Sequence, residues 1–254
     1  MKFFSDVFHL LGRQWRLTSR MPVFLVMSIV QPIVWMLLFS QLFSKAMAAG
    51  FGEGYVQFLA PGIAIMSSLF GSGYAGMGLL NDIDRGVMDR MLATPVTRIA
   101  IILARVIHTG ATAMIQSSVI LIVALFLGAR PKSALGFLTV LAAAALLGAG
   151  MGGISHCMAI LTRKQEAMFA VMNFTMLPMI YLSSTIMNKG LMPNWIKNVS
   201  TYNPVDWAVT VARSGFEGKV WTQTVGEHAL ALIAFTAVFS FLSTQAFKRY
   251  RAAM

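Results

Sequence analysis

Long apolar runs, separated by short charged stretches, dominate the chain and set its expected fold. A helix needs roughly 20 apolar residues to cross about 30 Å of hydrocarbon, and six segments reach that length. They cover about residues 23–43, 58–80, 99–127, 134–161, 167–187 and 228–247. The pattern predicts an all-α membrane protein, with residues 1–254 forming a single transmembrane domain of six membrane-spanning helices.

Lys and Arg are distributed unevenly between the stretches that join the predicted spans. An even number of spans places both termini on one side, and cations favour the cytoplasmic side. The side with both termini carries 13 of the 20 cations, so we expect cytoplasmic N and C termini. The basic lead before the first span is roughly 20 residues long, which is too long for a cleaved leader. We therefore interpret that span as a retained anchor.

Residues 1–22 predict an amphipathic helix that lies on the cytoplasmic surface of the membrane. One face is apolar and consists of Phe4, Val7, Phe8, Leu11 and Trp15. The opposite face is polar and consists of Asp6, His9, Arg13, Arg16 and Arg20. A helix of this kind lies flat in the interface with its Trp at headgroup depth. A basic anchor without further role is the alternative.

Residues 81–98 join the second and third predicted spans. Residues 82–94 predict one short amphipathic helix, and Pro95 opposes its continuation. Its apolar stripe consists of Ile83, Val87, Met88, Met91 and Leu92, and the polar residues opposite are Asp82, Arg85 and Asp89. An apolar stripe outside the bilayer needs a cover, and a groove on a partner protein is one way to provide it. Packing on the protein's own core or on the lipid surface is the alternative.

Residues 188–227 are too apolar for a fully solvated loop, yet three charged residues disfavour a full crossing: Lys197, Asp206 and Arg213. A re-entrant or interfacial pair of helices on the outer side fits both properties. The aromatic belt at the membrane surface would then include Trp195, Tyr202 and Trp207. An ordinary outer loop packed on the spans is the alternative.

Composition restricts the classes of function. Of 254 residues, 57% are apolar and 11% are charged, with a mean hydropathy of +0.71. A net charge of +11 favours nucleic acid only when the cations cluster on an exposed folded surface. Here they flank apolar runs, which indicates anionic membrane lipid as the partner, and we expect no nucleic acid. The lone Cys157 excludes an intrachain disulfide, and the four histidines do not approach a metal-binding spacing.

Two glycine-rich stretches, residues 71–76 and 148–153, match the GxGxxG pattern of dinucleotide sites. That pattern works after a strand and at a helix N-terminus, whereas these stretches lie inside predicted spans, so we interpret them as small residues that let helices approach closely. The sequence has no P-loop pattern. Ser155 and His156 are adjacent and therefore a poor nucleophile and base pair. None of the nine acids lies inside a predicted span, which argues against a proton relay.

These features together resemble the ABC-2 type permeases, the transmembrane subunits of ABC exporters for drugs, polysaccharides and lipids. The resemblance covers nearly the whole chain and rests on residues 58–63 at the start of the second span, 86–98 in the cytoplasmic stretch, and 191–195, 203–204 and Arg213 in the outer segment. The outer segment is most similar to the branch with daunorubicin-type and nodulation-factor exporters. One departure is Asp84-Arg85, where the family often has Glu shortly before the glycine.

The resemblance implies the permease subunit of an ATP-driven exporter that moves an amphipathic drug-like, lipid-like or glycan substrate out across the bacterial inner membrane. It implies two permease copies, with a homodimer expected, and two copies of a cognate ATPase subunit that binds ATP and Mg. This chain itself would bind no cofactor and would be no enzyme. An ATP-independent channel or carrier is the alternative.

The resemblance also assigns roles to residues. The ATPase would dock at residues 81–98, with the contact made by Asp82, Ile83, Arg85, Gly86, Val87, Met88, Asp89, Met91, Leu92 and Pro95. Spans one and five line the dimer interface in this family. The substrate route between the two copies would therefore pass Gln31, Trp35, Asn173 and Tyr181.

Overall fold

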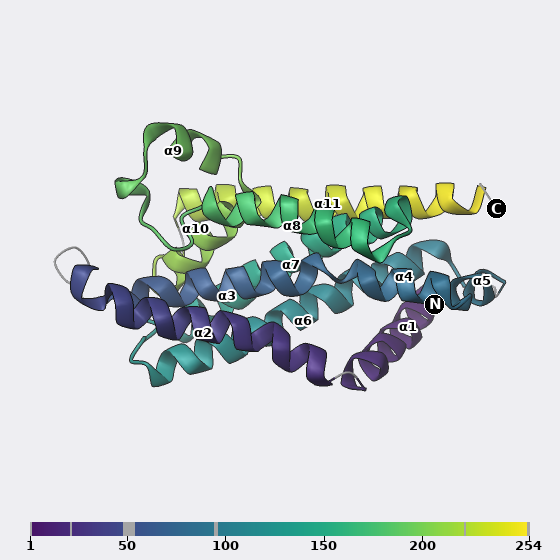
Figure 1. The fold of residues 1–254 in the computed structure, drawn as a ribbon, viewed down its shortest axis with the longest axis horizontal. Coiled ribbons are helices and arrows are strands. Elements are labelled where there is room, and N and C mark those ends of the chain that lie inside the picture. Colours follow the sequence, from purple (N-terminus) through teal and green to yellow (C-terminus); the bar gives the residue numbers. More distant parts are fainter. Residues whose placement is uncertain (1, 21, 48–53, 94–95, 221, 253–254) are drawn as a thin grey trace.

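The computed structural model describes residues 2–20, 22–47, 54–93, 96–220 and 222–252. Its helices in chain order are α1 (Lys2–Ser19), α2 (Pro22–Met47), α3 (Tyr55–Gly73), α4 (Gly76–Asp84), α5 (Val87–Leu92), α6 (Arg98–Phe126), α7 (Ala134–Thr162), α8 (Gln165–Tyr181), α9 (Asn194–Ser200), α10 (Pro204–Phe216) and α11 (Gln223–Ala252), with a short 3₁₀ turn, η1 (Lys189–Leu191), before α9 (Figure 1).

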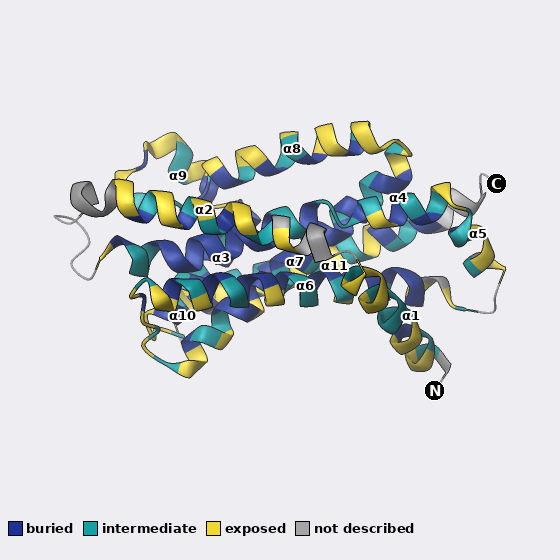
Figure 2. Ribbon diagram, turned by 60° about the horizontal axis from the view of Figure 1, so that its bottom comes forward, coloured by how far each residue is buried: buried dark blue, intermediate teal, exposed yellow. Residues whose placement is uncertain are grey.

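The long helices run side by side along the long axis of the molecule (Figure 1). Helix α7 packs against α3, α6, α10 and α11, and α3 and α7 are largely buried, whereas α2 and α8 expose much of their surface (Figure 2). Helices α1, α4 and α5 lie at the same end as the C-terminal part of α11, which we name the terminal end. Helices α9 and α10 lie at the opposite end, the α10 end.

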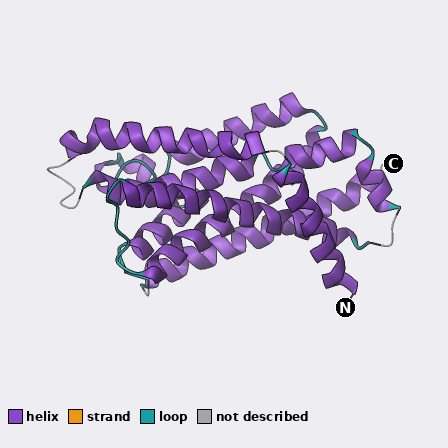
Figure 3. Cartoon of the chain, turned by 90° about the horizontal axis from the view of Figure 1, so that it is seen from below, coloured by secondary structure: helices purple, strands orange, loops and turns teal. Residues whose placement is uncertain are grey.

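Every regular element in the described ranges is helical (Figure 3), so the all-α prediction is confirmed for them. Within these ranges, four helices are long and apolar enough to cross a membrane: Tyr55–Asp84, Ile99–Phe126, Ala134–Thr162 and Gln223–Phe247. They coincide with the second, third, fourth and sixth predicted spans. A shorter apolar stretch, Ser28–Leu42, lies in α2 at the first predicted span. The chain is therefore a multi-pass membrane protein.

The fifth predicted span, 167–187, differs from the structure. Helix α8 has 17 residues and ends at Tyr181, so it is about 25 Å long at 1.5 Å per residue. Its last carbonyl groups are bound from α10, because Asn203 Nδ2 donates to the carbonyls of Met179 and Leu182 at 2.6 and 3.0 Å. Continuing the helix would compete with these hydrogen bonds for the same carbonyl oxygens.

Small residues on α7 allow close approach of its neighbours. A Cβ on Gly152 would lie 2.7 Å from Thr109 Cγ2 of α6, and one on Gly153 would lie 2.9 Å from the backbone of Phe239 of α11. Both distances are too short for a carbon–carbon contact, so these positions require glycine. The interpretation of residues 148–153 as a helix-packing surface is confirmed, since both faces of the stretch contact helices.

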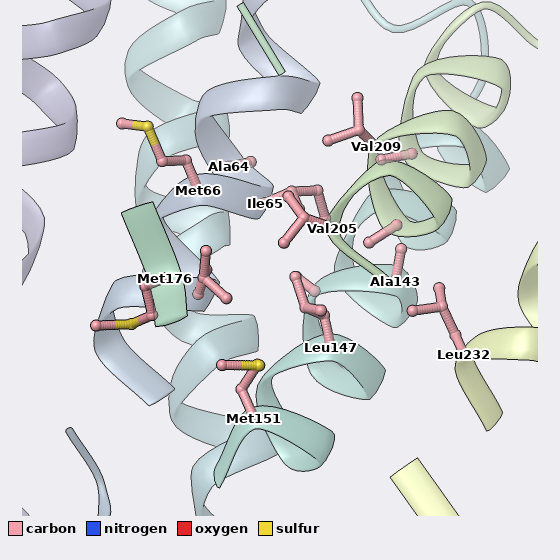
Figure 4. Packing of buried hydrophobic residues seen from close by; sticks show 14 of the residues in the cluster. Ala64, Ile65, Met66, Ala143, Leu147, Met151, Met176, Val205, Val209 and Leu232 are labelled. Atoms are coloured by element: carbon pink, nitrogen blue, oxygen red, sulfur yellow. The ribbon is translucent and has the colours of Figure 1, made fainter. Parts of the chain in front are cut away.

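The core lies where α7 meets α3, α10 and α11. Ile65 of α3, Leu147 of α7, Val205 of α10 and Leu232 of α11 point toward one another (Figure 4), and each of these side chains is fully buried. Helix α10 is thus part of the core. The prediction of a helical pair in residues 188–227 is confirmed as far as the helices α9 and α10 are concerned, while its depth in a membrane stays a prediction.

The predicted N-terminal amphipathic helix is present as α1, and it packs on α6. Val7 is buried between Ala100 and Ala104, whose small side chains let α1 come close. At the other end of α1, the Trp15 ring meets the His108 ring edge-on at 4.9 Å. Phe4 and Phe8 point away from this contact and are 77% and 76% exposed. Part of the apolar face therefore contacts protein, and part remains available for lipid.

Candidate functional site

The cytoplasmic stretch 82–94 does not form the single helix that its pattern predicted. Helix α4 ends at Asp84, and α5 begins at Val87. Between them Gly86 has φ +64°, a left-handed conformation that glycine adopts without steric cost. Its backbone N–H donates to the carbonyl of Ile83 at 2.9 Å, which closes α4 as a glycine C-terminal cap does. The prediction of one continuous helix is wrong for this reason.

Asp82 is the center of a buried ion-pair cluster. Arg13 of α1 donates to it through two nitrogens, at 2.8 Å to Oδ1 and 3.1 Å to Oδ2, and Arg105 of α6 donates to Oδ2. The side chain of Arg105 is 4% exposed, that of Asp82 11% and that of Arg13 29%. The carboxylate of Asp82 therefore faces other side chains of this protein, and little of it faces solvent. Nothing in the local pattern indicates this, because Arg13 and Arg105 are 69 and 23 residues away.

The cluster also corrects the placement of acids relative to spans. The candidate span Tyr55–Asp84 is longer than the predicted 58–80 and includes Asp82 and Asp84, and the candidate span Gln223–Phe247 includes Glu227. The prediction that no acid lies inside a span is therefore wrong at these three positions. Asp82 lies in the last turn of α4, at the terminal end, and both of its oxygens accept from arginines. Its charge is therefore compensated by fixed cations, which is the usual state of an acid inside a membrane protein.

The apolar stripe of the coupling segment divides between the protein's own core and its surface. Met88 is fully buried against the core, as the alternative interpretation expects. Ile83, Val87 and Met91 are half-buried, and the charged residues beside them are exposed: Arg85, Asp89 and Arg90. The side chain of Leu92 and all of Pro95 lie outside the described residues. Ile83 and Met91 also pack in part against the core.

The four residues predicted along the substrate route lie on two peripheral helices, α2 and α8. Gln31 and Tyr181 are exposed, whereas Trp35 and Asn173 are half-buried. Asn173 Nδ2 donates to the carbonyl of Phe169 one turn earlier, at 2.9 Å, and Trp35 packs on Phe39 with ring centroids 4.9 Å apart. Both helices pack on α3. None of these four residues lines either of the two hollows described below, and their role stays a prediction.

A second cluster of charges lies at the α10 end. Asp206 is fully buried; its Oδ1 accepts from the backbone N–H of Ser184 at 2.9 Å, and its Oδ2 pairs with Lys189 Nζ at 2.5 Å. Arg213 Nη2 donates to the carbonyl of Ser184 at 2.9 Å, and its guanidinium lies 3.7 Å from the center of the Phe58 ring. Burial lowers the pKa of Arg213 to about 10, so it remains a cation at neutral pH.

Two hollows are each lined in part by residues of α10 and α11. One, of about 640 Å³, is apolar and is lined by α7 and α11 side chains that include Leu138, Leu146 and Leu232. The other, of about 560 Å³, is polar and includes Lys132, Arg213 and His228. The α10 end therefore presents an apolar and a cationic surface close together.

The glycine-rich stretch 71–76 and Ser155 form a structural contact. Helix α3 ends at Gly73 and α4 begins at Gly76. Ser155 Oγ of α7 donates to the carbonyl of Gly73 at 2.5 Å and accepts from the N–H of Gly76 at 2.9 Å. These bonds satisfy backbone groups that the interrupted helix leaves without partners. Both hydrogen bonds of the Ser155 hydroxyl are made to backbone groups of this interruption, which agrees with the prediction that Ser155 and His156 are a poor nucleophile and base pair.

Comparison with known proteins agrees with this architecture. The family profile described as ABC-2 type transporter matches residues 5–216. The chain is 26% identical over 251 residues to the "Putative transport permease ycf38" of Cyanophora paradoxa, which covers 93% of this chain and 87% of that protein. It is 25% identical over 234 residues to the "Daunorubicin resistance ABC transporter permease protein DrrB1" of Streptomyces coeruleorubidus, covering 91% and 82%. The chain therefore belongs to the ABC-2 type transporter family, as a multi-pass transport permease.

Proposed function

We propose that the chain is the permease subunit of an ATP-driven exporter, and that hydrolysis of ATP takes place on a separate subunit that docks on α5. The observation that carries the proposal is that α5 buries one side in the protein and leaves another side at the surface of the terminal end. Buried Met88 anchors the helix to the permease core, while Val87 and Met91 remain half-buried beside exposed charges. Half-buried apolar side chains beside exposed charges are a usual composition for a docking surface.

The proposal includes six membrane spans with both termini in the cytoplasm. Helix α1 and the C-terminal part of α11 lie at one end of the molecule (Figure 1), which agrees with an even number of crossings. Helix α2 would be the first span. Helix α8 would be the fifth, which requires a locally thinned bilayer or a contribution from the chain after Tyr181, because α8 alone covers only about 25 Å.

Two copies of the permease, taken as a homodimer, and two ATPase subunits with ATP and Mg complete the proposed assembly. Exposed apolar residues on the two peripheral helices support the contact between copies: Val30, Val34 and Leu38 on α2, and Phe174 and Leu177 on α8. Such faces suit either lipid or a second copy. Gln31, Trp35, Asn173 and Tyr181 would then border the route between the copies.

The cargo proposed is an amphipathic drug-like, lipid-like or glycan molecule, exported across the bacterial inner membrane. The name of the Streptomyces relative links that protein to daunorubicin resistance, which supports an amphipathic compound as the first to test. Daunorubicin and a fluorescent phospholipid, each offered to inside-out vesicles with ATP, are suitable probes.

The test is assembly with an ATPase subunit, which we expect to be encoded beside this gene. We expect the two subunits to co-purify and the permease to raise the rate of ATP hydrolysis. The double variant Val87→Glu with Met91→Glu should abolish both, because two buried carboxylates would have to be desolvated in the contact. The matched control is Leu191→Glu with Val199→Glu, which adds two acids at exposed apolar positions near the α10 end and should leave assembly intact.

Two results would contradict the proposal. If the α5 double variant assembled as the wild type does, the ATPase would not dock on α5. Conductance or substrate flux through the wild-type chain without ATP would instead support a channel or an ATP-independent carrier, which is the alternative function. Conductance in planar bilayers without nucleotide measures the second directly.

A further inference from the structure

The polar hollow of about 560 Å³ lies at the α10 end, beside the first residues of three candidate membrane spans. Gln57, Lys132 and Thr224 line it, and each lies within two residues of the start of α3, α7 or α11. Lys132 and Thr224 are exposed, so the hollow can be reached from the surface. The ends of membrane spans lie in the headgroup region of a bilayer. The hollow is therefore at the depth of the lipid phosphate groups.

Cations from separate parts of the chain meet in this hollow. Three of the seven cations that the sequence does not assign to the cytoplasmic side line it: Lys132, Lys189 and Arg213. They belong to the connection between α6 and α7, to η1 and to α10. The fold thus concentrates cations on the side where the distribution of charge along membrane proteins disfavours them. Such a concentration indicates a site for an anion.

Lys132 is held at the hollow through the backbone of the connection between α6 and α7. Gln57 of α3 accepts from the N–H of Arg130 and donates to its carbonyl, both at 2.7 Å. The N–H of Lys132 donates to the carbonyl of Phe216, the last residue of α10, at 3.1 Å. The side chain of Lys132 forms no ion pair with any residue that the structure describes. Its charge is kept beside the hollow without a protein anion to compensate it.

The acids around the hollow do not balance its cations. One carboxylate, Asp206, pairs with Lys189 at 2.5 Å and also stabilises the charge of Arg213 through space. Glu217, an acid that lines the hollow, pairs with Lys219 at 3.2 Å. Together with the lysine of the connection between α6 and α7, four cations meet two acids. An excess of two positive charges suits an anion such as a phosphate group.

Arg213 has a donor that the protein itself leaves unused. Its Nη2 donates to the carbonyls of Ser184 and Thr185 at 2.9 and 3.4 Å, and the Phe58 ring covers the guanidinium. Its Nε is buried and has no hydrogen-bond partner within the described ranges. A buried donor without an acceptor is costly. Because Arg213 lines the hollow, an anion bound there would be an acceptor close to this side chain.

The apolar hollow of about 640 Å³ favours a lipid over a free anion as the occupant. On α11, Thr224 and His228 line the polar hollow, whereas Val225 and Ala229 line the apolar one. Consecutive residues of a helix point about 100° apart, so the two hollows lie along adjacent faces of the first turns of α11. A molecule with a phosphate headgroup and acyl chains can place each part in the hollow that suits it.

We infer that the polar hollow binds the phosphate headgroup of an anionic membrane lipid, with Lys132, Lys189 and Arg213 as its cationic contacts. Basic pockets between transmembrane helices bind headgroups of this kind. The site lies at the end opposite to the cytoplasmic cations that the sequence assigns to anionic lipid. A bound lipid joins the connection between α6 and α7 to η1, α10 and α11. The inference concerns the permease alone and does not require an ATPase.

The variant to test is Lys132→Glu, which reverses one charge in the hollow and keeps the backbone contacts of that position. The matched control is Lys197→Glu, which makes the same change on α9, at a residue that does not line the hollow. Lys132→Arg is the conservative variant. Each protein is the whole chain purified in detergent. Thermal unfolding without added lipid should agree among them to within a few degrees, because no ion pair of the described residues is removed.

Native mass spectrometry of the lipid-bound and lipid-free protein measures the affinity for two lipids with the same acyl chains, phosphatidylglycerol and phosphatidylcholine. The wild type, Lys132→Arg and Lys197→Glu should bind phosphatidylglycerol about ten-fold or more tightly than phosphatidylcholine. Lys132→Glu should bind phosphatidylglycerol about ten-fold or more weakly than the wild type does, because an attractive contact becomes a repulsive one. Its affinity for phosphatidylcholine should not change.

Three results would overturn the inference. Equal losses in Lys132→Glu and Lys197→Glu would show a diffuse effect of charge at the α10 end. Equal affinity of the wild type for the two lipids would remove the preference for an anionic headgroup. Inorganic phosphate, added at the same concentration as phosphatidylglycerol, should not displace it, because phosphate makes no contact with the apolar hollow. If phosphate did displace the lipid, the hollow would be a site for a free anion.

Discussion

The two buried charge clusters of the protein are built from the same residue types and are arranged in opposite ways. At the terminal end, Asp82 binds side chains of two other helices, Arg13 and Arg105. At the α10 end, Asp206 and Arg213 bind mainly backbone groups of the segment after α8, at Ser184 and Thr185. Charged groups that bind backbone replace the missing hydrogen bonds of an irregular segment, so they fix its shape. Charged groups that bind each other connect elements that remain separate.

The surroundings of the two clusters strengthen this difference. Helix α4 has an interruption at each end, including the left-handed Gly86. The segment after α8 is instead held at several backbone groups. Asn203 binds the carbonyls of Met179 and Leu182, and Tyr55 donates to the carbonyl of Ile186 at 3.1 Å. The comparison indicates an α10 end fixed through backbone groups and a terminal end built from short helices that side-chain ion pairs join.

Substitution of the buried acid at the α10 end should have the largest effect on stability. In Asp206→Ala, the N–H of Ser184 loses its acceptor and the nearby buried Arg213 loses an anion, so we expect a loss of about 3 kcal/mol in the free energy of unfolding. Thermal unfolding in detergent measures it. Glu217→Ala is the control, since Glu217 pairs with Lys219 on the surface, where pairs contribute about 0–1 kcal/mol. Equal effects of the two substitutions would contradict the structural role of Asp206.

The long helices could be predicted from the sequence because each depends on residues within it. The apolar length of 99–127 and the small residues at Gly148 and Gly152 are local properties, and the structure agrees with both. The end of α8 at Tyr181 could not be predicted, since it depends on Asn203, more than 20 residues away. The candidate site shows the same limit: Val87 and Met91 could be placed on a helix, whereas the burial of Asp82 depends on Arg13 and Arg105.

The glycine between α4 and α5 allows an intermediate test, in which function changes more than stability. Gly86→Ala places a Cβ in open space at φ +64°, so its cost is the strain of a left-handed residue, about 1 kcal/mol. The strain favours a continuous helix from α4 into α5 and would turn the docking face. We expect assembly with the ATPase to weaken clearly while thermal unfolding shifts by only a few degrees.

The control for this change lies in the same element. Gly78 is a helical position of α4 where an added methyl group would meet open space, and Gly78→Ala should stabilise the helix by about 0.5–1 kcal/mol. Assembly should not change. If Gly86→Ala bound the ATPase as well as Gly78→Ala does, the interruption between α4 and α5 would have no part in docking.

The smallest expected effect concerns the side-chain hydrogen bond between Asn81 of α4 and Gln165 of α8. Gln165→Ala removes one hydrogen bond on the surface, and water can replace it, so stability should change by no more than about 0.5 kcal/mol. Because a single surface hydrogen bond does not fix orientation, assembly with the ATPase should also remain. Loss of assembly in Gln165→Ala would mean that α8 positions α4, and through it the proposed docking helix α5, as strongly as the ion pair with α1 does.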